Sequence, residues 1–203
     1  MAILKIARMG HPILKKVAEV VPDPTAPEIA QLVDDMVETM LDAPGQGLAA
    51  PQVYVSKRIV VYIPPPSELD DEDDDEAANG NGPRIQVLVN PVISMLDDDM
   101  NENWEGCLSV PELRGVVPRY TRIHLAASQL DGSVIDETVE GHHARVLQHE
   151  CDHLDGVLYP QRMRDLSTLM FVSEMRHLIA EARAAREAAE AAEAAAEAEL
   201  ENE

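Results

Sequence analysis

The sequence predicts an α+β domain in which short, mostly antiparallel strands surround one central helix, with a further helix toward each end of the chain. Three observations support this fold class. Apolar residues recur at helical spacing between residues 29 and 41, short β-type runs follow one another between residues 57 and 140, and a second helical pattern begins at Gly141. A chain of 203 residues with 45% hydrophobic content is long enough to bury the core of one such domain.

The first predicted helix follows the sequence TAPE at residues 25–28. Thr25 and Glu28 have the spacing of a capping box, so we expect Thr25 to be the N-cap. The apolar stripe behind it covers three turns and consists of Ile29, Leu32, Val33, Met36, Val37, Met40 and Leu41. The proline and glycines of APGQG at 43–47 are expected to end this helix.

The predicted strands occupy residues 57–63, 85–93, 114–120, 122–130 and 133–140. Asp131 and Gly132 between the last two predict a hairpin, because this dipeptide suits a tight turn. A helix is then expected from Gly141 to about Leu154. A third should begin near Asp165, where Leu169, Val172, Met175 and Ile179 repeat at helical spacing.

The net charge of −22 is concentrated in two acidic segments. Residues 68–76 supply −8 and residues 187–203 supply −7, which leaves −7 on the rest of the chain. We therefore expect a domain of residues 1–175 that contains a disordered acidic loop at 64–83, and an Ala/Glu-rich helical extension at 176–203. The charge of the remaining body argues against a DNA-binding surface.

Cysteine content and apolar runs indicate a cytoplasmic protein that does not associate with a membrane. Cys107 and Cys151 are too few for a disulfide framework. The opening residues MAILKIARMG lack the apolar core of a signal peptide, and no apolar run approaches the roughly 20 residues that span a bilayer.

The sequence QHECDHLDG at residues 148–156 indicates a metal site. On a helix, His149 and His153 lie on one face and can direct their imidazole nitrogens at a single cation. Glu150 lies about 100° round the helix from His149 and can reach a water held on that cation.

Two residues could supply the third ligand. Glu174 lies 21 residues after His153 on the next predicted helix, which is the arrangement of one class of metalloendopeptidase. Cys107, in WEGCLSVPE, lies 42 residues before His149 and could present a thiolate from a turn. A structural site would need four protein ligands, and only three can be named. The residues alone favour Cys107 only modestly.

Three segments resemble the signature segments of peptide deformylases, in the same order: GQGLAAPQ at 45–52, EGCLS at 105–109 and QHECDHLDG at 148–156. ARMGHPILKKVAEVV at 7–21 and VNPVI at 89–93 are also similar to that family, so the resemblance covers roughly residues 3–175. It implies a peptide-deformylase-like fold and a metal-dependent hydrolase. Its substrates would be N-formyl-methionyl nascent peptides, its product formate, and the ribosome a transient partner.

The resemblance also implies roles for individual residues. Cys107, His149 and His153 would bind one divalent metal ion, Fe(2+), with Zn(2+) or Ni(2+) able to occupy the site. Glu150 would be the general base and then the general acid, and Gln52 with the backbone N–H of Leu108 would hold the oxyanion. The expected substrate contacts are Gly47, Gln46, Gly106, Arg114 and Val146. The position of Gln46 is usually aliphatic in the family, so this polar residue is a departure.

The remaining cysteine, histidines and nearby carboxylate are expected to have supporting or surface roles. Cys151, about 200° round the helix from His149, should be a buried thiol. Glu105 is expected to orient a metal ligand. His142, His143 and His177 belong to no motif and are expected at the surface or at helix ends.

Overall fold

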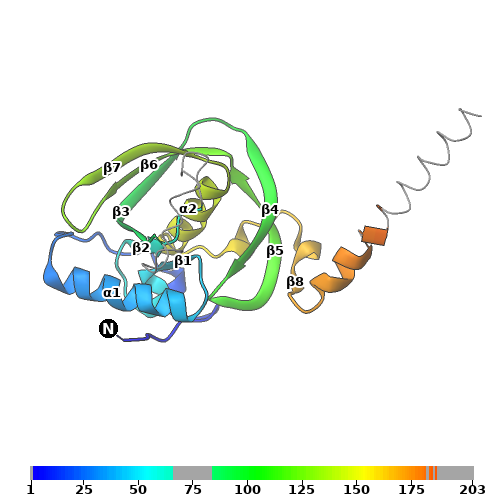
Figure 1. Ribbon diagram of the computed structural model, residues 1–203, viewed down its shortest axis with the longest axis horizontal. Coiled ribbons are helices and arrows are strands. Elements are labelled where there is room, and N and C mark those ends of the chain that lie inside the picture. The colour runs from blue at the N-terminus through cyan, green and yellow to red at the C-terminus, as the bar shows by residue number, and fades with distance from the viewer. Residues whose placement is uncertain (1, 66–83, 182, 185, 187–203) are drawn as a thin grey trace, which may run out of the picture.

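The computed structural model describes residues 2–65, 84–181, 183, 184 and 186, and it confirms the α+β class. Two antiparallel sheets flank a central helix, α2 (Gly141–Leu154), which contacts strands of both (Figure 1). The five-stranded sheet has the order β1-β2-β3-β6-β7 and the three-stranded sheet the order β4-β5-β8.

The five-stranded sheet consists of β1 (Gly47–Ala49), β2 (Ile59–Tyr62), β3 (Gln86–Met95), β6 (Arg122–Ser128) and β7 (Val134–Glu140). The three-stranded sheet consists of β4 (Met100–Cys107), β5 (Val110–Tyr120) and β8 (Met170–Phe171). The other helical elements are α1 (Pro27–Asp42) and four 3-10 turns: η1 (Pro12–Lys15), η2 (Ala50–Val53), η3 (Tyr159–Gln161) and η4 (Leu166–Thr168).

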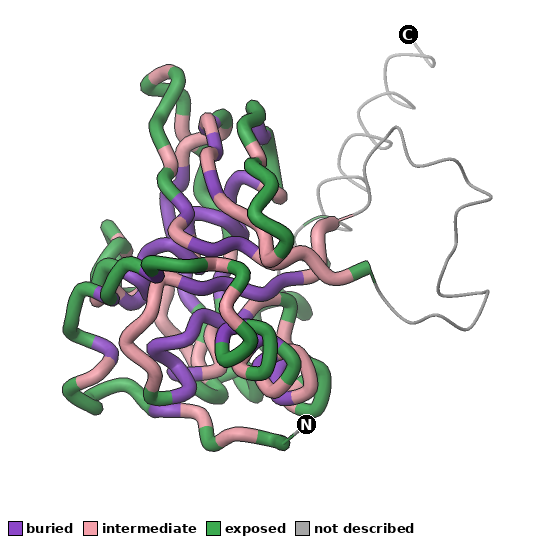
Figure 2. The backbone as a smooth tube through the Cα atoms, turned by 90° about the vertical axis from the view of Figure 1, so that its left-hand side faces the viewer, coloured by how far each residue is buried: buried purple, intermediate pink, exposed green. Residues whose placement is uncertain are grey.

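The five-stranded sheet is covered by a helix on each face. Along β2, Val60 and Tyr62 pack in the same cluster as α2, whereas Ile59 and Val61 pack in the cluster that holds the apolar stripe of α1. This alternation is the period of two that a strand buried on both faces requires. Figure 2 shows the buried residues gathered in the interior, with exposed residues around them.

Several predicted elements are confirmed. Strands β6 and β7 form the expected hairpin, and Gly132 takes a φ of +83° in its turn. Helix α2 has the predicted bounds. The predicted stripe of α1 buries Ile29, Val33, Met36 and Met40.

Two predictions about helix ends are wrong. The N-cap of α1 is Ala26, and the Thr25 hydroxyl instead donates to Asp23, 2.7 Å away. The helix expected from Asp165 does not form there, because Asp165 caps the short turn η4 and β8 then pairs with Leu113 and Arg114 of β5. Helical structure resumes at residue 175.

The sequence prediction missed β1, β4 and β8. Strand β4 reads MNENWEGC and shows no apolar alternation, because its functional and charged residues replace the apolar face. The predicted acidic loop at 64–83, beyond residue 65, and most of the predicted extension at 176–203 lie outside the described residues.

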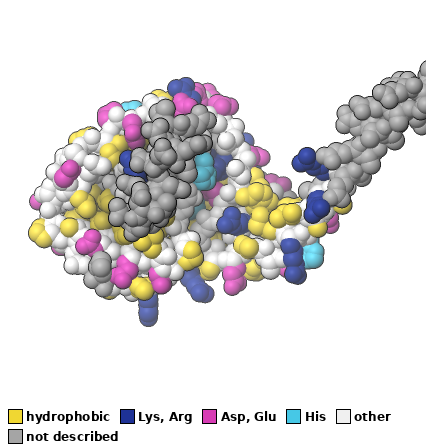
Figure 3. Space-filling model, in the orientation of Figure 1, with side chains coloured by type: hydrophobic (Ala, Val, Ile, Leu, Met, Phe, Trp, Pro, Cys, Tyr) yellow, Lys and Arg dark blue, Asp and Glu magenta, His cyan; other side chains and the backbone are white. Residues whose placement is uncertain are grey.

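Several large apolar side chains are exposed near β8. Figure 3 shows apolar side chains gathered at this end of the molecule beside Lys and Arg side chains. The exposed large apolar residues in this part of the chain are Leu166, Phe171, Val172, Leu178 and Ile179. None of the described helices is long and apolar enough to cross a membrane.

Candidate active site

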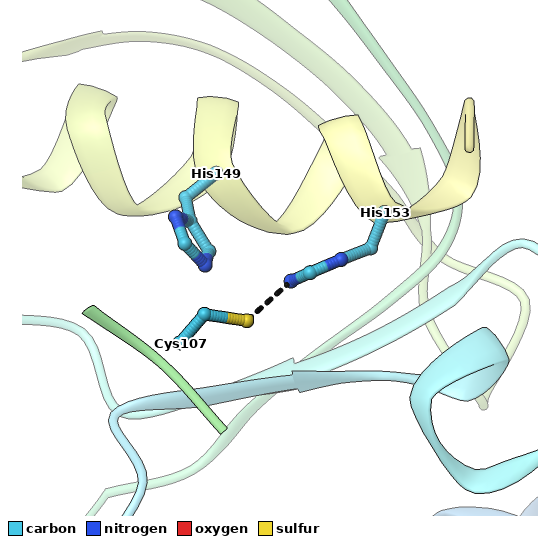
Figure 4. Close-up of side chains that lie close together, drawn as sticks. All are labelled: Cys107, His149 and His153. Atoms are coloured by element: carbon cyan, nitrogen blue, oxygen red, sulfur yellow. Dashed lines mark hydrogen bonds between the residues drawn. The ribbon is translucent and has the colours of Figure 1, made fainter. Parts of the chain in front are cut away.

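Three potential metal ligands converge between α2 and the end of β4 (Figure 4). The donor atoms of Cys107, His149 and His153 all lie within 4.8 Å of one another, and within the described ranges no other group of this kind occurs. The Cys107 Sγ lies 3.3 Å from Nε2 of His153. A thiolate with two imidazoles is a donor set that suits a divalent cation and leaves a fourth position open.

Local structure explains how these donors meet. His149 and His153 are one turn apart on α2, and the amide of Gln148 fixes the helix against β5 by bonding both the N–H and the C=O of Tyr120. Cys107 is the last residue of β4, just before a two-residue turn in which the Ser109 N–H lies 3.4 Å from its sulfur. Strands β4 and β5 together with α2 thus bring the three donors close to one another.

Glu105 orients His149, as expected. Its Oε2 accepts a 2.8 Å hydrogen bond from Nδ1 of His149, so Nε2 is the ring nitrogen that could bind a metal. Burial would raise the pKa of Glu105, but hydrogen bonds from His149 and Arg119, together with their charges, hold this pKa at about 2. Glu105 is therefore a carboxylate at every physiological pH.

A buried network of ion pairs extends from Glu105. Arg119 bonds both carboxylate oxygens of Glu105 at 2.9 and 3.0 Å, and Arg145 bonds Oε1 at 2.8 Å. Arg119 also reaches Asp152 at 2.6 Å, and Arg162 bonds the same carboxylate. Sequence reasoning missed these residues. The sequence offered one sign of this network: Arg119 is a charged residue near the end of the strand predicted at residues 114–120.

The electrostatics favour a thiolate at Cys107. Burial alone would raise its pKa, but the charges and hydrogen bonds of His153 and His149 outweigh burial and hold this pKa well below the usual value. Burial likewise would lower the pKa of His149, whereas its hydrogen bonds with Cys107 and Glu105 raise it well above the usual value. The protein thus stabilises the ionised form that a metal requires of its sulfur ligand.

Glu150 lies beside the ligands, and Gly47 packs directly against it. The Oε2 atom of Glu150 is buried and has no hydrogen-bond partner among the described residues. Burial raises the pKa of this carboxyl group. A Cβ at position 47 would lie only 2.3 Å from Oε1 of Glu150, so any larger residue there would have to displace this carboxylate. An unpaired carboxylate oxygen in this position is suited to exchange a proton with a substrate or water.

Gln52 presents its amide N–H groups to the site. Its Oε1 accepts a 2.8 Å hydrogen bond from the Ala49 N–H, which fixes the orientation of the amide. Nε2 then donates to Ser109 Oγ at 3.1 Å and lies 3.6 Å from the Cys107 sulfur. The donor end of this buried side chain is therefore directed at the site.

A pocket of about 490 Å³ opens over these groups. It is lined by two of the three ligand residues and by Glu150, Gln52 and Leu108. Every residue expected to contact substrate also lines it: Gln46, Gly47, Gly106, Arg114 and Val146. Trp104, the only tryptophan of the chain, also lines it. The structure therefore brings all the predicted site residues into one region.

The residues outside the predicted site are partly as expected. Cys151 is buried, and burial raises its pKa to about 12. Glu174 is exposed and lies 3.9 Å from His177, so it does not join the ligand group. His143 lies in the first turn of α2, at a helix end as expected, and is half-buried with its Nε2 2.9 Å from the Tyr62 hydroxyl. His142 is exposed, but it lines the pocket and lies 3.3 Å from Gln46.

Comparisons with known proteins identify the family of this chain. The family described as polypeptide deformylase matches residues 3–168. Peptide deformylase 1 of Bordetella pertussis is 49% identical over 80% of this chain and 88% of its own length, and peptide deformylase 1 of Nitrosomonas europaea is 44% identical over 79% and 88%.

Solved structures give the same result. A class I type b peptide deformylase from Acinetobacter baumannii, with Met-Ala-Ser bound, aligns with a TM-score of 0.67 at 36% identity, covering 80% of this chain and all of that one. Peptide deformylase from Thermotoga maritima aligns with a TM-score of 0.68 at 35% identity, covering 81% and 100%. The chain belongs to the peptide deformylase family, the metal-dependent hydrolases that remove the N-terminal formyl group from nascent polypeptides.

Proposed function

We propose that Cys107, His149 and His153 hold one divalent metal ion, and that the formyl group of formyl-methionyl peptides is hydrolysed beside it. The observation that carries this proposal is the convergence of a sulfur and two imidazoles within 4.8 Å, next to the unpaired Oε2 of Glu150. Fe(2+) is the proposed metal, with Zn(2+) or Ni(2+) able to replace it, because thiolate and imidazole suit all three.

Glu150 moves the proton in the proposed reaction. A divalent cation supplies a nucleophile at neutral pH by lowering the pKa of a coordinated water toward 7. Glu150 accepts a proton from the attacking water and then delivers it to the amide nitrogen as the carbon–nitrogen bond breaks. The products are formate and a free amino terminus. The raised pKa of Glu150 suits it to hold the proton between these two steps.

Gln52 and the backbone N–H of Leu108 are proposed to stabilise the oxyanion. The Gln52 amide is already oriented with its N–H groups toward the site, so little reorganisation is needed. It donates without itself titrating. One such donor contributes roughly 3–4 kcal/mol to the transition state.

The peptide is proposed to add as a strand to the free edge of β1. The Gln46 carbonyl accepts from the Ile63 N–H, so residue 46 faces the neighbouring strand. Alternate residues of an antiparallel pair face opposite edges, and the Gly47 N–H and C=O therefore point away from β2. Backbone pairing at Gly47 would position the peptide, with Gly106, Arg114 and Val146 as further contacts.

The cellular setting is also a proposal. We infer a cytoplasmic enzyme that meets nascent chains during a transient contact with the ribosome. Residues 1–175 would form the catalytic domain, with 176–203 as an appended extension. The tripeptide bound in the Acinetobacter baumannii relative, Met-Ala-Ser, indicates a suitable probe for this chain, formyl-Met-Ala-Ser.

The experiment measures formate release from formyl-Met-Ala-Ser by protein purified without oxygen, together with its metal content. Glu150→Gln should keep the metal and lose about 10²- to 10⁴-fold in kcat, because the amide cannot exchange a proton. Glu102→Gln, at an exposed position on β4, is the matched control and should keep full activity. Substantial activity in metal-loaded Glu150→Gln would contradict the proposed role.

A further inference from the structure

One wall of the pocket carries a polar pair that the mechanism above does not use. Gln46 precedes β1, His142 lies in the first turn of α2, and their side chains meet with Nε2 of each 3.3 Å apart. An amide nitrogen can only donate, so the imidazole nitrogen must accept. The amide has two N–H groups, and only one is used in this contact. His142 therefore holds a hydrogen-bond donor in place at the pocket wall.

The position of this pair relative to the ligands indicates which part of a substrate it meets. His142, Val146 and His149 are spaced i, i+4 and i+7, so they share one face of α2. His142 is about 10 Å from His149 along the helix axis. Val146 lines the pocket between them.

On the proposed function, a peptide paired with Gly47 and with its formyl group at the ligands would place its first side chain over this face. An unbranched side chain as long as that of methionine would then extend across Val146 toward Gln46 and His142, which line the same pocket. The polar pair would thus face the end of the first side chain.

The chemistry of the pair is unsuited to a purely apolar tip. A thioether sulfur is a weak acceptor, whereas the oxygen of a sulfoxide is a strong one. We propose that Gln46, positioned by His142, enables this enzyme to accept formyl peptides whose first residue is methionine sulfoxide. The unused N–H of Gln46 donates to the sulfoxide oxygen. This inference rests on the proposed function and concerns only the choice of substrate.

The test compares kcat/KM for formyl-Met(O)-Ala-Ser with kcat/KM for formyl-Met-Ala-Ser. Gln46→Met has nearly the length of glutamine but no N–H, so the ratio of sulfoxide to thioether should fall about threefold to tenfold. The loss should be in KM, because the bond is the same in the ground and transition states. His142→Leu removes the group that positions the donor and should lower the ratio less. Gln31→Met, on the exposed side of α1, is the matched control and should leave the ratio unchanged.

Binding of the products gives a second readout that does not depend on turnover. Trp104 is the only tryptophan and lines the pocket, so its fluorescence can follow titration with Met(O)-Ala-Ser and Met-Ala-Ser. Gln46→Met should weaken binding of the sulfoxide peptide more than that of the thioether peptide. An unchanged ratio and unchanged peptide affinities in Gln46→Met would overturn the inference. Failure of the wild type to hydrolyse formyl-Met-Ala-Ser would instead contradict the proposed function.

Discussion

Substitution of Gly47 by alanine should disable the enzyme without removing its metal. The new Cβ would lie 2.3 Å from Oε1, 2.6 Å from Cδ and 2.9 Å from Cγ of Glu150. Ordinary contact needs about 3.5 Å, so the carboxylate must retreat by about 1 Å. A displacement of this size can cost about 100-fold in rate, equivalent to roughly 2.7 kcal/mol of barrier.

The assay for Gly47→Ala is kcat for formate release from formyl-Met-Ala-Ser, with metal content measured on the same sample. Gly10→Ala is a useful comparison because Gly10 has a φ of +103° and open space around its Cβ position. In that variant, backbone strain should lower the free energy of unfolding by about 1–2 kcal/mol, and activity should be unchanged. If Gly47→Ala retained a third or more of the wild-type kcat with metal bound, the reasoning about Glu150 would be refuted.

Three further predictions concern acid, oxygen and the tail. The pKa of Glu105 is about 2 in the folded chain, against an ordinary value of 4.5. Its carboxylate therefore adds up to about 3 kcal/mol to the free energy of unfolding above pH 4.5, and this contribution is lost as the pH falls toward 2. In metal-stripped protein unfolded by denaturant, the free energy of unfolding should therefore fall less steeply between pH 4.5 and 2 in Glu105→Gln than in the wild type. If the metal is iron, activity should decay in air and the nickel-substituted enzyme should last longer, because Fe(2+) and the Cys107 thiolate are both oxidisable; equal lifetimes would argue against iron as the labile part. Removing residues 187–203, which carry −7, should leave co-sedimentation with ribosomes at low salt unchanged or raised, because ribosomal RNA repels acidic segments; clear loss of co-sedimentation would contradict this.

The ligands and the central helix could be predicted from the sequence because their signals are local. HExxH needs only one turn of helix, and α2 has the predicted bounds. The supporting ion pairs could not be predicted, because Glu105, Arg119 and Asp152 come from β4, β5 and α2 and meet only after the two sheets pack. Short strands could not be predicted for a related reason. Strand β8 has only two residues, and it is defined by its pairing with β5, which is distant in the sequence.

The close packing of Gly47 against Glu150 illustrates the same limit. A glycine at the start of a strand suggests that another group approaches the backbone closely, but the sequence does not say which group. Likewise, the contact of Gln46 with His142 joins residues 96 positions apart, and no periodicity links them. Local patterns therefore found the reacting groups, whereas packing defined the walls of the pocket.

The burial of α2 has a consequence for how this chain can tolerate mutation. Of its fourteen residues ten are buried, whereas α1 buries five of sixteen, so α1 has an outer face on which substitutions meet only solvent. On α2 almost every change would meet a neighbour. Arg145, Gln148 and Asp152 each bond a different partner, so a shift of the helix by one residue would break all three. Neutral substitutions should therefore be more frequent on α1 than on α2. The sequence of α2 should stay recognisable in distant relatives of the chain.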